Sequence, residues 1–431
     1  MLVRRSVIFL SAALFMSVTY PQSAMRGAPI SGRPAVALKE LVSEALKNNP
    51  EIKAALNERE AARQRISPAG ALEDPMLEAG FLNVPATSWR LNREDMTMKM
   101  LGLSQKLPSP GKRALRRDVA AKDAEAVEQG YQETVNRVAR DVKLAYFDLG
   151  LAVETARLIK ENTLILEQFL RIAEGRYSVG QGTQSDVLKA QTQLAKMSEE
   201  LLRMEREVPV MEAELARLLG RAGVAAPVAV ALPQMRDTGF DLGPLRETAL
   251  RQRPQLIALR TLIDKGSLAL DLARKESDPD FDVRFSYGQR DKTLDGMPRS
   301  DMLSLTVAIN LPIWGKDKTE PRIAEAQAMR DQAMSLYQAQ QNEVFSKLRQ
   351  QAAVAEQSRK SAQLYDTAIL PQAALAVESA LAAYRVSRVD LLTLLDSQMN
   401  LFNFGIGRAA AVVNLNKALA EVDLLTGAAQ F

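Results

Sequence analysis

The sequence contains neither cysteine nor histidine. Without cysteine, the chain has no disulfides, no thiolate metal sites, no cysteine nucleophile and no lipidated N-terminal cysteine. Without histidine, it has no HExxH zinc site, no histidine-containing catalytic triad and no histidine acid–base catalysis. Any catalysis would have to use carboxylates, lysine or serine. We therefore expect a protein that is not an enzyme, with no catalytic residue, no cofactor and no bound metal.

Aromatic residues are scarce, at 5%, and no strong excess of charge of either sign is present, with 56 Lys and Arg against 52 Asp and Glu. These charges are spread along the chain without a long basic run, so the sequence does not indicate a nucleic-acid partner. Hydrophobic residues (47%) and charged residues (25%) lie near the averages of globular proteins, which argues against a disordered or collagen-like chain. Ala, Leu, Gln, Glu and Arg dominate, which favours long helices.

Residues 1–24 are typical of a secretory signal peptide. Arg4 and Arg5 precede an apolar run from Val7 to Val18, and Ser23 and Ala24 offer a cleavage site. The alternative is a short membrane anchor, although the run is shorter than the ~20 residues that span a bilayer as a helix. An exported chain without cysteine fits the periplasm or the outer membrane of a bacterium.

The chain is an internal duplication. Asp74-Pro75 recurs as Asp278-Pro279, 204 positions later, and the same offset relates Leu107-Pro108 and Gly111-Lys112 to Leu311-Pro312 and Gly315-Lys316. Farther along, the offset is 207 and relates Tyr177 to Tyr384 and Gly220 to Gly427. Repeats of this kind indicate one structural unit used twice. We expect a first repeat over 37–220, a linker over 221–241 and a second repeat over 242–427.

Each repeat is predicted to contain a short helix, a long helix and a final helix. Apolar positions in the first long helix alternate steps of three and four residues, which is typical of coiled-coil packing. Pro68 and Gly70 are expected to kink or fray the end of the first short helix, and Pro371 is expected to kink the second long helix. In each repeat the short and final helices together match the long helix in length, which predicts two antiparallel helical columns. The expected ranges are 50–73, 111–175 and 183–220, and then 254–277, 316–380 and 387–427.

Four strands are expected, at 76–84, 98–107, 280–288 and 302–311. In the last of them Leu303, Leu305 and Val307 alternate with polar or small residues, so the strand has one apolar face. Strands of about ten residues are long enough to cross a bilayer when tilted. The alternative is a half-buried sheet in a soluble protein. In a membrane, four strands cannot close a barrel, so the barrel would be shared between chains. Two chains would give a filled eight-stranded barrel, whereas three would leave room for a bore.

The order and double occurrence of several segments resemble the TolC family of bacterial outer-membrane efflux proteins, from about Ala37 to Gly427. They are the helix start Asn49-Pro50-Glu51-Ile52, the strand exit Gln105-Lys106-Leu107-Pro108 with Gly111-Lys112, and the tip segments from Tyr177 to Leu188 and from Tyr384 to Leu392. The strand exit looks most like the branch paired with heavy-metal resistance pumps. Many members of that branch carry a lipidated N-terminal cysteine, which this chain lacks.

The resemblance implies a mainly α fold with a small β part. It implies a long α-helical, coiled-coil barrel in the periplasm and a transmembrane β-barrel in the outer membrane, with four strands per protomer and two internal repeats in a homotrimer. Its partners would be a periplasmic membrane-fusion adaptor, an inner-membrane pump of the RND type and outer-membrane lipid. The function implied is that of a passive exit duct in a tripartite efflux system. The alternative from another class is a periplasmic coiled-coil scaffold without a channel.

The resemblance also suggests functional residues at the two tips. Acidic residues there ring the pore constriction in the family, so we expect the constriction at Asp186, Asp396, Asp390 and Arg388. Asp186 and Asp390 could instead cap helices. Thr393 stands where some members carry another acid. Contact with the adaptor is expected at the small-residue-rich turns, namely Val179, Gly180, Gln181, Gly182, Thr183, Ser185, Val386, Ser387 and Val389.

Three other patterns were weighed as sites. Gly111-Lys112 and Gly315-Lys316 lack the spacing of a phosphate-binding loop, so we interpret these glycines as bends between strand and helix. Met96, Met98 and Met100 would share one strand face, which suggests either a soft-metal site or simple packing, and packing is the preferred interpretation. A carboxylate-dependent hydrolase is disfavoured, because no paired acids lie on loops of a compact domain.

Overall fold

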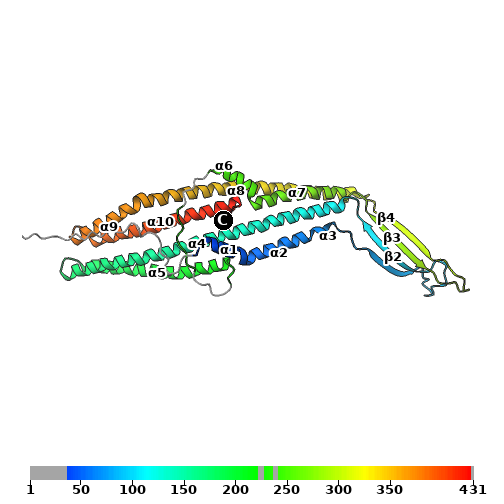
Figure 1. Ribbon diagram of the computed structural model, residues 1–431, viewed down its shortest axis with the longest axis horizontal. Helices are drawn as coiled ribbons and strands as arrows, with labels where there is room; N and C mark the ends of the chain where they lie inside the picture. Colours follow the sequence, from blue (N-terminus) through cyan, green and yellow to red (C-terminus); the bar gives the residue numbers. More distant parts are fainter. Residues whose placement is uncertain (1–35, 222–227, 236–240, 429–431) are drawn as a thin grey trace, which may run out of the picture.

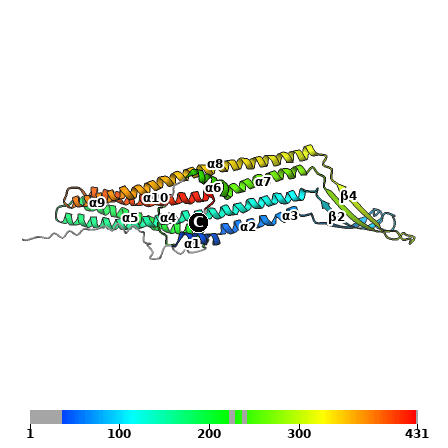
Figure 2. The same ribbon diagram turned by 45° about the horizontal axis from the view of Figure 1, so that its top comes forward.

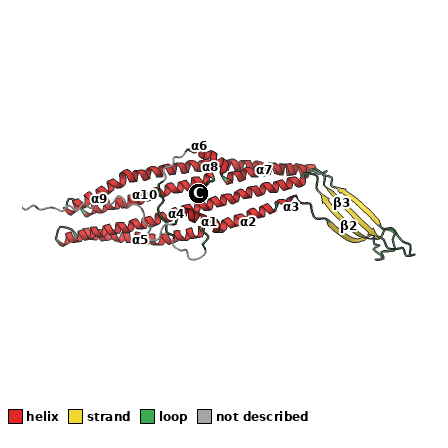
Figure 3. Cartoon of the chain, in the orientation of Figure 1, coloured by secondary structure: helices red, strands yellow, loops and turns green. Residues whose placement is uncertain are grey.

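The computed structural model describes residues 36–221, 228–235 and 241–428, so the expected signal peptide lies outside the described residues. The chain is a long helical rod with a β-sheet at one end (Figure 1, Figure 3). This architecture confirms the mainly α fold with a small β part. Among the described helices, none is both long and apolar enough to cross a membrane.

The element order of the first half recurs in the second. The first half contains α1 (Leu38–Asn48), α2 (Pro50–Gln64), α3 (Ile66–Gly70), β1 (Met76–Leu82), β2 (Met98–Leu107), α4 (Lys112–Ser178) and α5 (Gln184–Leu218). The second half contains α6 (Leu242–Gln252), α7 (Pro254–Lys275), β3 (Phe281–Gln289), β4 (Met302–Ile309), the π-helical turn η1 (Gly315–Thr319), α8 (Glu320–Leu364), the π-helical turn η2 (Tyr365–Ile369), α9 (Leu370–Arg385) and α10 (Leu391–Thr426).

The short helices differ from the prediction in two ways. Helices α1 and α6 precede the proline starts and were not predicted; Asn49 and Arg253 then take extended backbone because each comes before a proline. The helix expected over 50–73 breaks at Arg65 and ends at Gly70. Pro68 has no N–H to donate to the carbonyl four residues earlier, which explains a break one turn before it.

The long helices run along most of the length of the rod. Helix α4 runs unbroken for 67 residues, which makes it roughly 100 Å long. Its counterpart is divided by η2 directly before Pro371, where the sequence predicted a kink. A π turn is a common adjustment where a helix loses a backbone donor.

The shorter helices stack end to end alongside the long ones. Figure 2 shows α5 and α2 following one another along α4, and α10 and α7 along α8 and α9. Two columns per repeat were predicted from the helix lengths. Buried apolar side chains of α4 such as Leu149, Ile159 and Leu166 lie on the predicted seam, and such burial is the main stabilising contribution to the bundle.

A glycine lies at each joint, the place where two short helices stack end to end. Gly220 follows α5 with φ +71°, and a Cβ there would lie 2.7 Å from the Asn48 carbonyl oxygen. Gly427 follows α10 with φ +85°, and a Cβ there would lie 2.5 Å from the Gln252 carbonyl oxygen. The two glycines are repeat equivalents, so the same close approach of backbones is used twice.

The sheet is antiparallel in the order β1-β2-β3-β4. The register aligns Leu77, Leu103, Phe285 and Leu305 in one row across all four strands, and Glu78, Gly102, Ser286 and Ser304 in the neighbouring row. Successive residues of a strand point to opposite faces, so one face is apolar and the other largely polar. The apolar face is open: Leu77 is 71% exposed and Leu305 70%. Within the described chain, the outer edges of β1 and β4 pair with no further strand.

Replacing the glycine at a helix joint should destabilise the rod. We expect Gly220→Ala and Gly427→Ala each to cost at least about 1–2 kcal/mol of unfolding free energy, because alanine disfavours a left-handed backbone and its methyl group would also press on the neighbouring carbonyl. The measurement is a urea denaturation midpoint in detergent.

Gly130→Ala in the middle of α4 is the matched control, because open space surrounds its Cβ position. That variant should be neutral or gain about 0.5–1 kcal/mol. Equal effects of all three substitutions would contradict the role of the two joints.

Candidate functional site at the helical tip

The two tip turns lie side by side at the end of the rod opposite the sheet (Figure 1). Residues 179–183 join α4 to α5, and residues 386–390 join α9 to α10. Gly180 (φ +73°) and Ser387 (φ +60°) occupy equivalent positions in them. The backbone bonds are equivalent as well: Gln181 N–H donates to the Arg176 carbonyl at 2.8 Å, and Arg388 N–H donates to the Ala383 carbonyl at 2.9 Å. The predicted adaptor-contact residues therefore gather at one end of the molecule.

Arg176 of the first repeat holds the second repeat's tip. Its Nη2 donates to the Gln181 carbonyl at 2.9 Å and to Ser387 Oγ at 2.6 Å, and its Nη1 donates to the Tyr384 carbonyl. The guanidinium carbon lies 4.4 Å from the centre of the Tyr384 ring. Hydrogen bonds from a charged donor and a cation–π contact reinforce one another here. We call Arg176, Tyr384 and Ser387 the tip clamp.

Tyr384 is the buried part of the tip clamp, with 2% of its surface exposed. Burial raises the pKa of its hydroxyl, and the negative charge of Asp186 raises it further, while Arg176 opposes both. Among the described residues its hydroxyl has no hydrogen-bond partner. The ring therefore serves as a packing surface for Arg176 rather than as an acid or base.

The tip clamp occurs only once in the described chain. The position 207 residues after Arg176 is Ala383, and the equivalent of Tyr384 is Tyr177, which is 50% exposed. Arg176 is not among the site residues predicted from the sequence. A comparison of the residues preceding the two repeat tyrosines would have found the difference.

The residues expected at the constriction have different surroundings. Asp390 caps α10: its Oδ1 accepts from Thr393 N at 3.0 Å and from Thr393 Oγ1 at 2.6 Å, and these bonds hold the pKa of the Asp390 carboxyl below its ordinary value. Asp186 is half-buried in the first turn of α5, where Thr183 provides the cap, and Asp396 and Arg388 are exposed. The alternative of helix capping thus holds for Asp390, and a constriction at these four residues stays a prediction.

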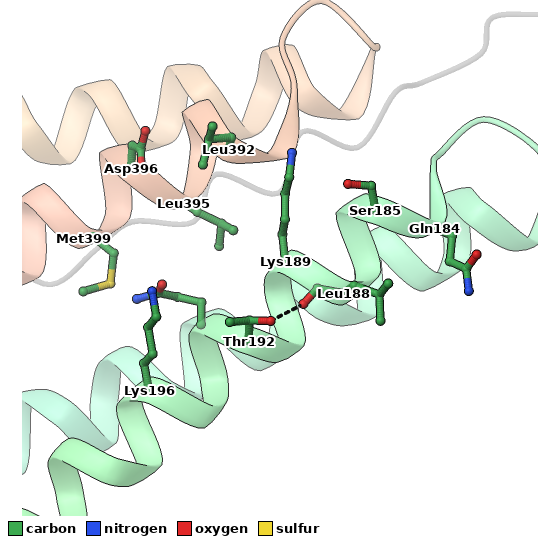
Figure 4. A pocket seen from close by; sticks show the side chains of 11 residues that line it. Gln184, Ser185, Leu188, Lys189, Thr192, Lys196, Leu392, Leu395, Asp396 and Met399 are labelled. Atoms are coloured by element: carbon green, nitrogen blue, oxygen red, sulfur yellow. Dashed lines mark hydrogen bonds between the residues drawn. The ribbon is translucent and has the colours of Figure 1, made fainter.

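A groove of about 470 Å³ separates α5 from α10 just behind the tips (Figure 4). Lys189 and Lys196 come from α5, and Asp396 comes from α10. Apolar side chains such as Leu188, Leu395 and Met399 complete its lining. Such a groove offers an apolar surface bordered by charges of both signs, which suits a helical or extended protein segment more than a small reactive substrate.

The methionines near the sheet do not gather as predicted. Met98 and Met100 point to the same, largely polar face of β2, but Met96 precedes the strand and is 51% exposed, so the expectation of three on one strand face was wrong. Met98 instead packs against Gly288. Among the described residues, no group of three or more acidic side chains could hold a metal ion.

A second polar contact between the repeats lies deeper in the rod. Gln398 Nε2 donates to Asn162 Oδ1 at 2.9 Å, and Asn162 Nδ2 donates to Met197 Sδ at 3.3 Å. Both amides are nearly fully buried. A buried polar pair among apolar helices fixes the alignment of those helices, because any shift would leave the amides unpaired.

Removing the tip clamp should loosen the tips without unfolding the rod. In Arg176→Ala, we expect amide hydrogen exchange at 177–183 and 384–388 to become on the order of 10-fold faster, since hydrogen bonds to a charged group contribute about 1.5–3 kcal/mol. Hydrogen exchange with mass spectrometry measures this.

Arg171→Ala, an exposed position five residues earlier in α4, is the control. It should leave the tip amides unchanged. Equal protection of the tip turns in Arg176→Ala and in the unmodified protein would show that the turns are held by their backbone bonds alone.

Comparison with known proteins relates this chain first to a family. Residues 41–221 match the family described as outer membrane efflux protein. The cobalt-zinc-cadmium resistance protein CzcC of Cupriavidus metallidurans is 26% identical over 183 residues, and the alignment spans 42% of each chain.

Solved structures resemble nearly the whole chain. The outer-membrane channel OprN has a TM-score of 0.78 at 18% identity and covers 91% of both chains. The outer membrane channel CmeC of Campylobacter jejuni has a TM-score of 0.75 at 18% identity, over 92% of this chain and 89% of that one. At these identities the likeness shows the fold, and the sequence match in the first half supplies the relationship. Residues 41–221 are therefore similar to the outer membrane efflux protein family, and the chain as a whole shares its fold with solved outer-membrane channels.

Proposed function

We propose that the chain is the subunit of a trimeric outer-membrane exit duct in a tripartite efflux system, which passively conducts substrates delivered by an inner-membrane transporter through a periplasmic adaptor. The observation that supports it most is the sheet, with one open apolar face, one largely polar face and two unpaired edges. Apolar residues facing lipid and polar residues facing a lumen are the pattern of a transmembrane barrel strand.

The polar face is suited to line an aqueous bore. Glu78 and Arg284 form an ion pair across β1 and β3, with 3.4 Å between Oε1 and Nη2. Ser104, Ser286 and Ser304 lie on the same face. In lipid such charged groups would be costly, whereas water in a lumen solvates them.

Trimeric assembly follows from closing the sheet. An open strand edge cannot lie in hydrocarbon, because its N–H and C=O groups would lack partners. Two chains would give eight strands and a side-chain-filled interior, whereas three give twelve strands and an interior wide enough for a channel. The helical columns of three chains would then continue the channel into the periplasm.

The tips are the proposed contact with the adaptor. Val179, Gly180, Gln181 and Val386 are exposed at the end of the rod farthest from the sheet. The groove between α5 and α10 continues from them. The duct itself would do no chemistry, and the inner-membrane pump would supply the energy. The name of the relative CzcC, a cobalt-zinc-cadmium resistance protein, favours heavy-metal cations as cargo. The RND-type pump is expected from the family resemblance alone.

A periplasmic scaffold without a channel is the alternative, and the open apolar face argues against it. Contiguous exposed apolar surface of this extent marks a surface that another phase or protein covers. Fractionation separates the two functions: the duct is extracted only by detergent, while a scaffold is released in plain buffer. A monomer that is stable in buffer would overturn the proposed duct.

A lysine on the apolar face should block membrane insertion. In Leu305→Lys we expect most of the protein to be lost from the outer-membrane fraction, because a lysine facing lipid near mid-bilayer costs roughly 2–4 kcal/mol. Leu305 touches little else in the chain, so the helical rod should still fold.

Ser304→Lys is the matched control, one residue away on the polar face. We expect it to insert normally, as judged by the membrane fraction on a gel. If both lysines are tolerated, or both are rejected, the apolar face does not lie against lipid.

Neutralising the tip carboxylates should change ion selectivity. Three chains would bring three copies each of Asp186 and Asp396 to one end of the bore, where clustered negative charges favour cations and bind multivalent ones. In planar bilayers, Asp186→Asn with Asp396→Asn should lower cation selectivity and weaken block by trivalent cations, with trimer assembly intact.

The control is Glu214→Gln with Glu247→Gln, which removes the same charge from exposed positions near the middle of the rod. It should conduct as the unmodified protein does. Unaltered selectivity and block in the tip variant would place the constriction elsewhere, while absence of any conductance in the unmodified protein would overturn the duct.

A further inference from the structure

A lysine joins the two repeats where the sheet meets the helices. Lys112 begins α4, and only 3% of its side chain is exposed. Its Nζ donates to the Asp278 carbonyl and to Asp280 Oδ1, each at 2.8 Å, and the Ser109 backbone N–H donates to the same Oδ1 at 2.8 Å. The end of β2 and the beginning of β3 are thereby held together beyond their strand pairing.

Asp278 belongs to the same cluster. Its carboxylate accepts from Lys275 Nζ at 2.8 Å and from Ser109 Oγ at 3.3 Å. We call Ser109, Lys112, Lys275, Asp278 and Asp280 the junction cluster. Two lysines and two carboxylates balance one another, so Lys112 can be buried with its charge compensated.

The equivalent residues in the other half have no such partners. Gly315-Lys316 repeats Gly111-Lys112, but Lys316 is exposed in the turn η1. Asp74, the equivalent of Asp278, is exposed directly before β1. Among the described residues, neither side chain makes a hydrogen bond or an ion pair. The two groups lie at the opposite, unpaired edges of the sheet, β4 and β1.

Because the chain is duplicated, the side chains of Lys316 and Asp74 would come together if two copies of the chain paired at their open strand edges. Within one chain, β2 of the first repeat pairs with β3 of the second, and Lys112 follows β2 while Asp278 precedes β3. When β4 pairs with β1 of another copy, Lys316 follows the first of these strands and Asp74 precedes the second. The pairing of Leu107 with Phe281 would recur as Leu311 beside Leu77, which continues the apolar face.

We propose that Lys316 of one copy binds Asp74 of a second copy of this chain, as the intermolecular counterpart of the contact between Lys112 and Asp278. This inference deepens the assembly in the proposed function and rests on it. As Lys112 Nζ does at Asp278, Lys316 Nζ would donate to the Asp74 backbone carbonyl. Lys112 also pairs with the Asp280 carboxylate, and because Met76 stands at that equivalent position, the Asp74 carboxylate is the acidic group left to balance the charge of Lys316. The contact would close the ring at the level where the sheet meets the helices.

The proposed contact between copies would involve fewer charged residues than the junction cluster. The positions equivalent to Lys275 and Asp280 are Ala71 and Met76, and Ile313 replaces Ser109. Asp74 therefore has no equivalent of Lys275 competing for its carboxylate, and Lys316 has only one carboxylate to bind. A single ion pair between copies replaces the five-residue cluster within a chain, so the junction between chains is the weaker of the two.

Charge reversal tests the contact in the full chain in detergent. Lys316→Glu and Asp74→Lys should each weaken the oligomer, by about 5-fold in dissociation constant per contact if the ion pair is at the upper end for exposed pairs. The double variant, Lys316→Glu with Asp74→Lys, should recover most of that loss. Lys318→Glu, an exposed lysine two residues away in η1, should change little.

Cysteine pairs give a second, direct measurement, because the chain has no cysteine of its own. With a short bis-maleimide, Lys316→Cys with Asp74→Cys should yield linked dimers and trimers on a denaturing gel, while each single variant stays monomeric there. Lys112→Cys with Asp278→Cys should cross-link within one chain and produce no ladder.

The results of these experiments distinguish a failure of the Lys316–Asp74 contact from a failure of the proposed trimer. Two outcomes would overturn the Lys316–Asp74 contact and leave the trimer in place. The first is an oligomer that forms normally but gives no cross-linked ladder. The second is a double charge-reversal variant whose oligomer is weakened by as much as the two single variants together. If the unmodified protein is a monomer in detergent, the proposed assembly fails, and the contact fails with it.

Discussion

The unpaired N–H and C=O groups at the edges of the sheet are the constraint on which the arrangement of the strands and helices depends. Four strands are enough to present an apolar face and a polar face, but they leave β1 and β4 open. In lipid those backbone groups need partners, and further copies of the chain can supply them. The long helices follow the same logic, because α4 and α8 continue directly from β2 and from the η1 turn after β4, so any closure of the sheet also arranges the helical columns. In the proposed assembly, closure of the sheet would therefore also set the arrangement of the helices.

Because the chain is duplicated, each local structural feature occurs twice, in two sets of surroundings. At the stacking joints the environments are alike, and Gly220 and Gly427 have the same left-handed backbone and the same close carbonyl contact. At the two ends of the rod they differ: Arg176 clamps Tyr384 while Ala383 cannot clamp Tyr177, and Lys112 is buried in a cluster while Lys316 is exposed. Differences between equivalent positions therefore identify where the two repeats of one chain make different contacts.

The repeat, the strands and the long helices could be predicted because their signals are local. Alternation in the second-repeat strands, carried to the first repeat by the duplication, predicted β2 at its observed limits of 98–107 and the other strands within two residues. X-Pro pairs marked the starts of α2 and α7. Pro68 and Gly70 predicted a kinked or frayed helix end, and the break lies earlier, at Arg65, because Pro68 acts on a carbonyl a turn before it. The tip clamp and the Asn162–Gln398 pair could not be read from one segment, because each joins residues more than 200 positions apart. Asp390 was ambiguous for a different reason: the same carboxylate suits a helix cap or a pore ring until Thr393 is placed beside it.

Three polar contacts join the two repeats of one chain along the rod. The tip clamp joins α4 to the turn after α9, the junction cluster joins α4 to β3, and the buried amide pair joins α4 to α10. Helix α4 takes part in all three, and it is unbroken over its whole length. The two repeats of a chain are thus fixed to one continuous helix, and relative movement within a chain would break several charged or buried hydrogen bonds at once. In the proposed trimer, a change in bore diameter at the tips could leave all of these bonds intact if whole chains moved against one another as rigid units.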